Sequence, residues 1–468
     1  MTDYDLIVRG GRVVTAGADG VADIAVRDGR VVALGARLDG SAAEEVDARG
    51  RLVLPGGFDA HVHFTPVSLP DRSLAWADDY VTGTAAAAAG GVTSVGDIAF
   101  TDPGENLAAG LERIARAASR VATVDFLLHP VMVDPSPERI AEISELAAGG
   151  ATSMKIFMHM AGFDQRLADY LAAMRAAGAA DLLTLIHCED RGVIDHCTHR
   201  LIEAGDTGLA HFPRTRPVAS ESAAVERAIA YAEATGAPIY IVHLSSRAAL
   251  DAVGRARARG LPVYVETRPI YLHFTRERFD GPEPALYVGN PPLREDADVE
   301  ALWSGLASGA VSTCCTDHAP WSRPDKLDRA LDVAHTRPGM ADLETLMPSL
   351  FSNGVRTGRI SLQRFVEITS TNAARLFGVY PRKGTIAVGS DADLVVWDPE
   401  LTRVVVPDEL ETAAKFSLFD GVELTGWPVL TLSRGTIVAE RSRAIRRPGH
   451  GRRLTRHTTP PPRPTIVL

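Results

Sequence analysis

The stretch LVLPGGFDAHVH, residues 52–63, joins an apolar strand to two histidines, His61 and His63. Alternate residues of a strand point to the same face, so the two imidazoles are expected to converge on one point. A strand end of this kind supplies half of a metal site. An isolated His-x-His pair is more often just two partly exposed histidines, so the metal interpretation depends on what the rest of the chain places beside them.

The region that follows alternates apolar, β-branched segments with Ala-rich amphipathic stretches, such as residues 107–119 and 138–148. The apolar segments predict strands buried on both faces, and the amphipathic stretches predict helices between them. Eight such units favour a (β/α)8 barrel of the α/β class over a doubly wound sheet, because no G-x-G-x-x-G motif follows a strand. The expected strands are Leu52–Leu54, Val92–Val95, Val124–Leu128, Ser153–Phe157, Leu182–Ile186, Ile239–Val242, Val263–Val265 and Val311–Cys314.

The two ends of the chain show a different pattern, in which short strands are separated by Gly-containing turns. Hairpins are expected over Leu6–Val14 and Ile24–Val32, and similar strands recur near the C-terminus. We therefore expect one small β-sandwich built from residues 1–54 and 381–447, with the barrel over 55–380. The Pro-rich residues 448–468 predict an extended tail that braces a partner subunit, although plain disorder explains them equally well.

Composition excludes several classes of protein. The 468 residues are 46% hydrophobic and 23% charged, which is ordinary for a soluble globular enzyme. The formal net charge of -10 argues against a nucleic-acid partner. The four cysteines form no paired framework, the acidic start does not resemble a signal peptide, and no apolar stretch is long enough to span a bilayer. These features predict a cytoplasmic protein without a membrane partner.

Further ligand-type residues follow the later barrel strands, at the end where barrel enzymes carry their catalytic groups. Four histidines and one aspartate exceed what one tetrahedral zinc requires, so we expect two divalent ions, zinc or a similar metal. Two close ions need a bridging anion, which the amine of Lys155 can provide by adding carbon dioxide to form a carbamate. An ordinary strand lysine is the alternative. The predicted metal ligands are His61, His63, Lys155, His187, His243 and Asp317.

A set of motifs is spread over nearly the whole chain: GGFDAHVH (56–63), Lys155, His187, VHLSS (242–246), PPLR (291–294), TDHAP (316–320), STNAARLFG (370–378), KGTI (383–386) and GSDADL (389–394). Together they resemble the amidohydrolase superfamily, in its branch of dihydropyrimidinases, hydantoinases, allantoinases and dihydroorotases. The C-terminal motifs are most similar to dihydropyrimidinases and hydantoinases.

This resemblance implies a role for each ligand. His61, His63, Lys155 and Asp317 are similar to the ligands of the more buried metal, whereas carboxylated Lys155, His187 and His243 are similar to those of the second. The family implies that a metal-bridged hydroxide attacks a ring amide carbonyl, while Asp317 acts as the catalytic base and then as the acid. It also implies a homodimer or homotetramer that acts on a small cyclic amide.

The chain departs from this family pattern near the expected substrate. Met160 stands where dihydropyrimidinases have a tyrosine, and methionine cannot donate a hydrogen bond. Thr65 stands where dihydroorotases have an arginine that binds the substrate carboxylate. Arg268 stands where relatives often have cysteine, and it is expected either to bind an anionic substrate group or to pair with Glu266. The candidate substrate-binding residues are Asn290, Arg268 and Ala341.

The sequence thus predicts a binuclear metal-dependent hydrolase that opens a dihydropyrimidine, a hydantoin or a related ureide ring. An allantoinase-like or dihydroorotase-like cyclic amidohydrolase is the alternative within the same class. A non-catalytic scaffold of the dihydropyrimidinase type is the more remote alternative, and it is disfavoured because all six predicted ligands are present.

Overall fold

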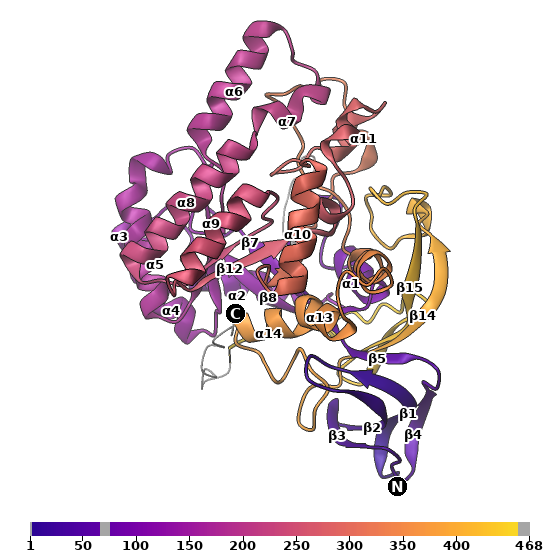
Figure 1. Cartoon of the computed structure of the whole chain (residues 1–468). Coiled ribbons are helices and arrows are strands. Elements are labelled where there is room, and N and C mark those ends of the chain that lie inside the picture. Colours follow the sequence, from indigo (N-terminus) through magenta and orange to yellow (C-terminus); the bar gives the residue numbers. More distant parts are fainter. Residues whose placement is uncertain (1, 66–74, 457–468) are drawn as a thin grey trace.

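The computed structural model describes residues 2–65 and 75–456. Its centre is a ring of parallel strands surrounded by helices (Figure 1). The strands form two sheets, β6-β7-β8 and β9-β10-β11-β12-β13, and parallel bridges from Val131 to Lys155 and from Val62 to His318 join the sheets into a closed barrel. The bounds are β6 Gly57–Val62, β7 Val92–Ala99, β8 Asp125–Pro130, β9 Ser153–Phe157, β10 Leu183–His187, β11 Ile239–Ile241, β12 Val263–Thr267 and β13 Thr313–Cys314.

The longer helices cover the outside of the barrel and bury an apolar face against it, as α2 shows. In α2, Leu107, Leu111 and Ile114 recur at helical spacing and are buried, and the side chain of Asn106 caps the first turn. No helix within residues 2–65 and 75–456 combines the length and apolar character needed to cross a membrane. The helices are α1 Thr82–Ala89, α2 Leu107–Ala118, α3 Pro137–Ala141, α4 Ile143–Ala148, α5 Leu167–Ala179, α6 Arg191–Ala204, α7 Phe212–Thr215, α8 Val218–Thr235, α9 Arg247–Ala258, α10 Asp296–Ser308, α11 Arg323–Lys326, α12 Leu346–Leu350, α13 Leu362–Val366 and α14 Asn372–Leu376.

Strands from both ends of the chain form one further sheet beside the barrel, where the indigo and yellow ribbons meet in Figure 1. Its order is β17-β16-β15-β14-β5-β1-β2-β3, and β4 pairs with β1. The N-terminal and C-terminal parts join where β5 pairs antiparallel with β14. The bounds are β1 Tyr4–Val14, β2 Asp19–Arg27, β3 Arg30–Gly35, β4 Ala42–Asp47, β5 Leu52–Pro55, β14 Leu394–Val404, β15 Glu423–Ser433, β16 Thr436–Glu440 and β17 Arg443–Ala444.

One predicted barrel strand belongs to this terminal sheet. Leu52–Leu54 lies in β5, and the first barrel strand is β6, which carries His61 itself. Gly56 separates the two strands at a point where a Cβ atom would come within 2.0 Å of the Thr93 hydroxyl, so only glycine fits there. A short apolar run is equally suited to either sheet, which is why its pattern did not reveal the correct one.

The two predicted N-terminal hairpins have different outcomes. The hairpin over Ile24–Val32 is confirmed, because β2 and β3 pair antiparallel around Asp28 and Gly29, both of which have positive φ. The hairpin over Leu6–Val14 is wrong, because these residues form the single strand β1. Gly10, with a φ of 65°, lies in a bulge of β1 instead of in a turn.

The described part of the tail lies on this chain's own barrel. The backbone of Arg452 and Leu454 bonds to Phe126 in β8, and the Arg456 amide donates to Gly150. These contacts show that residues 452–456 pack on the chain's own barrel, and bracing of a partner subunit by the tail stays a prediction. Residues 457–468 lie outside the described residues.

A buried ionic cluster connects the terminal sheet to the barrel. The Lys383 amine lies 2.6 Å from a carboxylate oxygen of Asp125 in β8, 3.0 Å from Asp391 and 2.7 Å from Asp393. Arg434 pairs with Asp125 from the other side. The lysine side chain is only 2% exposed, so its charge depends on these carboxylates for stabilisation.

Replacing Lys383 by methionine should therefore lower the free energy of unfolding by about 3–5 kcal/mol, because buried carboxylates lose their cation. Urea denaturation followed by circular dichroism measures this change. Arg255→Met is the matched control, since Arg255 pairs with Glu226 on the surface and such pairs contribute at most about 1 kcal/mol. Equal effects of the two substitutions would show that the cluster does not hold the sheet to the barrel.

Candidate metal centre

The six predicted ligands lie at the carboxyl ends of barrel strands, and all are buried. They reach this end of the barrel because each one lies within or just beyond a parallel strand that runs in the same direction. His61 lies in β6 and His63 just beyond it, Lys155 lies in β9, His187 ends β10, and His243 and Asp317 follow β11 and β13.

His61, His63 and Asp317 form the most compact part of this centre. Oδ1 of Asp317 lies 3.2 Å from Nε2 of His61 and 3.0 Å from Nε2 of His63. One ligand atom of each residue lies within 4.8 Å of the others. Two imidazole nitrogens and a carboxylate oxygen at this spacing suit a divalent metal of the zinc type.

The histidine rings form an arc around the centre. Ring centroids are 5.3 Å apart for His61 and His63, 5.5 Å for His61 and His243, and 4.5 Å for His243 and His187. Nδ1 of His243 and the amine of Lys155 are buried without a hydrogen-bond partner. Leaving a buried polar atom unpaired costs about 1–3 kcal/mol, so these atoms indicate a site for ligands that protein groups do not supply.

Burial keeps these bases in the form that binds metal. It lowers the pKa of His61 and His243 well below the usual value, and neutral imidazole is the ligating species. Burial also lowers the pKa of Lys155 to about 8, although Glu266 and Asp317 oppose the shift, so part of the amine is neutral near physiological pH. Burial alone would raise the pKa of Asp317, but His61 and Arg268 outweigh it and keep the carboxylate ionised.

Two glutamates orient the ligand rings. Oε1 of Glu266 lies 2.7 Å from Nδ1 of His61 and accepts the backbone N–H of His243 at 3.0 Å. Oε2 of Glu189 lies 2.8 Å from Nε2 of His187 and also accepts from Arg216. These carboxylates turn the opposite ring nitrogens toward the centre, as outer partners of metal-binding histidines do. Neither role was predicted from the sequence, although Glu189 stands two residues after His187, which is a usable signal.

Asp59 fixes the distance between the first and the last barrel strand. Its carboxylate accepts the backbone N–H of Thr316 at 3.1 Å, the hydroxyl of Thr316 at 2.5 Å and the backbone N–H of His61 at 3.1 Å. Thr316 precedes Asp317, so one carboxylate in β6 positions both the histidine and the aspartate of the compact trio.

Glu266→Gln should weaken metal binding by roughly 10- to 100-fold. The amide of glutamine can still orient the His61 ring, but it lacks the negative charge that makes this ring a stronger metal ligand. Competition with a chromophoric chelator measures this affinity. The matched control is Glu344→Gln, which changes a buried glutamate that accepts the backbone N–H of Glu411 far from the centre. Unaltered affinity in Glu266→Gln would remove Glu266 from the metal-binding machinery.

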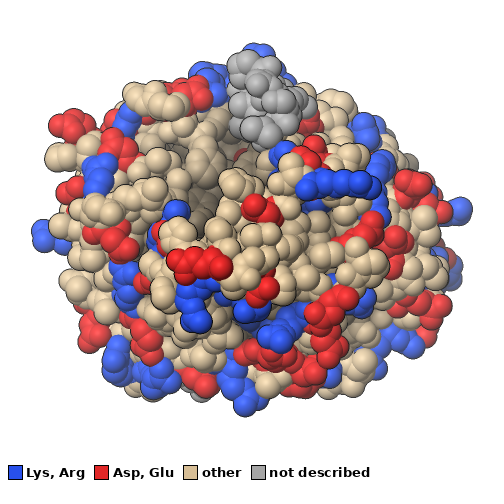
Figure 2. Space-filling view, turned by 90° about the horizontal axis from the view of Figure 1, so that it is seen from above, with Lys and Arg blue, Asp and Glu red and all other residues tan. Residues whose placement is uncertain are grey.

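A cavity of about 230 Å³ opens beside the centre. In the space-filling view of Figure 2, the molecule is hollowed at a place bordered mainly by uncharged side chains. Aromatic and imidazole rings provide much of the lining, and the polar groups are the four imidazoles, one amide and one carboxylate. The lining residues are His63, Trp76, Phe100, Phe157, His159, His187, His243, Asn290, Asp317, Ala319, Pro338 and Gly339.

The candidate substrate-binding residues differ in their relation to this cavity. Asn290 lines it, and its Oδ1 is buried without a hydrogen-bond partner. Arg268 and Ala341 are only 0% and 3% exposed and do not belong to the lining. Contact of Arg268 and Ala341 with the substrate stays a prediction, and the cavity lining does not support it. Arg268 also does not pair with Glu266, since its guanidinium bonds to Asp317.

Two further histidines near strand ends have different surroundings. Nδ1 of His129 lies 2.5 Å from the Ser153 hydroxyl and Nε2 lies 3.1 Å from the Ala60 carbonyl, which is a structural role inside the barrel. His159 instead lines the cavity, with its ring centroid 4.1 Å from that of His187. Met160 follows it and is not part of the lining.

Comparison with known proteins shows which families and structures this chain resembles. The model of the amidohydrolase family matches residues 52–438. The chain is 35% identical to D-hydantoinase from Ralstonia pickettii over 97% of its own length and 99% of that protein. It is similar to the crystal structure of dihydropyrimidinase from Brevibacillus agri, with a TM-score of 0.92, 35% identity and coverage of 99% and 100%. L-hydantoinase from Arthrobacter aurescens gives a TM-score of 0.88, 30% identity and coverage of 97% and 100%.

Proposed function

Since the chain belongs to the amidohydrolase family and is a cyclic amidohydrolase of the hydantoinase and dihydropyrimidinase type, we propose that it opens a dihydropyrimidine, hydantoin or related ureide ring. The observation that carries this proposal is the buried trio of His61, His63 and Asp317 beside a cavity of small-molecule size. The bond broken is a ring amide, and the products are a carboxylate and a ureido or amino nitrogen on one open chain.

The donor set fits two divalent ions. His61, His63 and Asp317 would hold the first ion, and His187 and His243 the second, with Lys155 between them as a carbamate. Support comes from the unpaired, buried amine of Lys155 and from the unpaired Nδ1 of His243. Nitrogen and oxygen donors of this kind favour zinc. When bound, such ions acidify water and polarise a carbonyl oxygen.

The residues of the chain supply proton transfer and orientation. Asp317 lines the cavity and remains ionised, so it can accept a proton from the attacking water and deliver it to the leaving ring nitrogen. Asn290 offers an unsatisfied carbonyl oxygen, which a ring N–H would satisfy. The aromatic rings of Trp76, Phe100 and Phe157 form another part of the cavity wall and limit the access of water to it.

Charge in the cavity separates the possible substrates. Among the described residues that line it, none is Lys or Arg, so a substrate carboxylate finds no ammonium or guanidinium side chain to pair with there. Position 65 carries a threonine instead of the arginine that binds the substrate carboxylate in dihydroorotases, which leads to the same conclusion. We therefore propose that uncharged rings are preferred over dihydroorotate.

The test is a hydrolysis screen of metal-replete enzyme across dihydrouracil, hydantoins, allantoin and dihydroorotate, with metal content measured on the same protein. We expect turnover of at least one uncharged ring, two divalent ions per chain, and loss of activity with a chelator that added zinc reverses. No turnover of any ring by protein that holds metal would contradict the proposed function. Faster turnover of allantoin than of the other rings would favour the allantoinase-like alternative.

A further inference from the structure

Arg268 is a fully buried cation that contacts Asp317, one of the residues lining the cavity. It follows β12 and is 0% exposed. Its Nη1 lies 3.2 Å from Oδ2 of Asp317, its Nη2 lies 3.5 Å from Oδ2 of Asp342, and its guanidinium carbon lies 5.6 Å from the ring centre of Tyr271. A buried guanidinium requires paired anions, and Asp317 makes the closer of the two contacts.

The two oxygens of Asp317 consequently have separate partners. Oδ1 faces Nε2 of His61 and Nε2 of His63, at 3.2 and 3.0 Å, whereas Oδ2 faces Arg268. Because the two oxygens are chemically equivalent, only a partial rotation of the carboxylate about its Cβ–Cγ bond changes the arrangement, and it moves both oxygens away from these partners. The contact with Arg268 opposes that rotation, because it gives Oδ2 a charged hydrogen-bond donor on the side away from the histidines.

The backbone of Asp317 needs support as well. Its φ is 51°, in the left-handed region that non-glycine residues seldom adopt. Such a conformation persists only where surrounding contacts maintain it. Asp59 bonds to the preceding residue, Thr316, and Arg268 bonds to the side chain of Asp317 itself.

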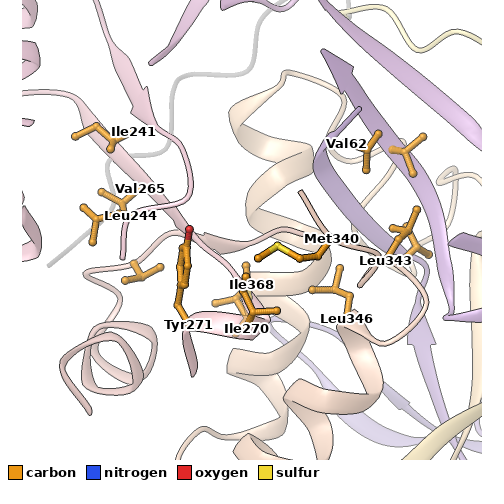
Figure 3. Close-up of a cluster of buried hydrophobic side chains, with 14 of the residues drawn as sticks. Val62, Ile241, Leu244, Val265, Ile270, Tyr271, Met340, Leu343, Leu346 and Ile368 are labelled. Carbon is orange, nitrogen blue, oxygen red and sulfur yellow. The ribbon is translucent and has the colours of Figure 1, made fainter. Parts of the chain in front are cut away.

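Arg268 also contacts the segments that complete the cavity wall. Its Nη2 lies 3.6 Å from Sδ of Met340, and its Nη1 would lie 3.7 Å from a Cβ atom on Gly289. Met340 follows Gly339, and Gly289 precedes Asn290, and both of these neighbours line the cavity. Tyr271 and Met340 belong to the buried hydrophobic cluster of Figure 3, which holds this region firmly.

We propose that Arg268 is a positioning residue, which holds Oδ2 of Asp317 so that Oδ1 faces His61, His63 and the cavity. Recognition of an anionic substrate group by Arg268 is the alternative, and it requires an exposed guanidinium that the structure does not have. The inference rests on the proposed function, because the role of Asp317 in proton transfer gives its orientation a kinetic consequence.

The kinetic test uses Arg268→Gln and Arg268→Lys, both saturated with zinc, on an uncharged ring that the wild-type enzyme hydrolyses. Arg268→Gln should lower kcat by roughly 10- to 100-fold and change KM by less than about twofold, because loss of an outer partner disturbs a group needed in the reaction. Arg268→Lys keeps the charge and should recover part of the lost kcat.

The matched control is Arg434→Met, which removes a partly buried arginine that pairs with Asp125 outside the cavity lining. It should lower the melting temperature and leave kcat per folded molecule unchanged. If Arg268→Gln behaves like this control, Arg268 stabilises the fold only and the proposal is overturned. A raised KM confined to anionic substrates, with unchanged kcat, would overturn it in favour of substrate recognition.

A crystal structure of metal-free Arg268→Gln tests the same proposal without any substrate. The carboxylate of Asp317 should rotate, so that neither of its oxygens stays close to both Nε2 of His61 and Nε2 of His63. An unchanged carboxylate would overturn the proposal even if the screen found no substrate, in which case the proposed function would fail independently. If Arg268→Gln does not fold, the structure of Arg268→Lys provides the test instead. The single ammonium of lysine cannot reach both Asp317 and Asp342 with the geometry of the guanidinium, so the carboxylate of Asp317 should again change its orientation.

Discussion

Lys155→Ala is expected to lose both bound metal and turnover. In the proposed centre Lys155 carries the anion between two cations, and its amine is buried in β9 without a hydrogen-bond partner. Removing that anion leaves two dications close together without a shared ligand, which is strongly unfavourable. We expect metal content to fall to one ion per chain or fewer and kcat/KM to fall by at least about 10³-fold, since a two-metal site contributes several kcal/mol to catalysis.

Elemental analysis and initial rates measure the two effects on one preparation. Adding acetate or propionate to Lys155→Ala should restore part of both, because a small carboxylate can occupy the space of the carbamate. The matched control is Lys326→Ala, which removes the other lysine that is fully buried in the described structure and donates to the carbonyls of Val288 and Arg337. This control should keep its metal. Full activity in Lys155→Ala would exclude the carbamate.

Asp317→Asn should lower kcat by about 10²–10⁴-fold, the usual contribution of a positioned acid and base. The amide keeps the size of the side chain, but it cannot accept and return a proton. Metal occupancy should also fall, because Asp317 lies within ligand distance of His61 and His63. Rates measured over a series of zinc concentrations separate these effects, since zinc corrects low occupancy but not the missing base.

Wild-type turnover in Asp317→Asn at the zinc concentration that already saturates the wild-type enzyme would remove Asp317 from the mechanism. Recovery of full kcat at high zinc would reduce its role to that of a ligand. The two outcomes differ in the zinc concentration at which activity returns, so one titration distinguishes them.

The metal centre could be predicted from the sequence because strands impose a simple geometry. Alternation places His61 and His63 on one face, and parallel strands bring His187, His243 and Asp317 to the same end of the barrel. No comparable rule predicts which side chains on neighbouring strands pair with each other. Glu266 and Arg268 both follow the strand alternation, which suggested a pair, yet Glu266 bonds to His61 and Arg268 bonds to Asp317.

The fold, too, could be predicted from the sequence only in part. Strand–helix alternation revealed the barrel, whereas the short apolar run of β5 suits burial in either sheet. What assigns Leu52–Pro55 to the terminal sheet is its pairing with β1 and with β14, and the latter begins at Leu394. That information lies far along the chain and is invisible in any local window.

The position of β5 between β1 and β14 has a consequence for biosynthesis. A ribosome releases Leu52–Pro55 long before it makes Leu394–Val404, so the nascent chain carries an apolar strand with one open edge while the whole barrel is being translated. Open edges of this kind favour association between chains. Messages or truncations that end before β14 should therefore yield insoluble protein even when every barrel strand has been translated.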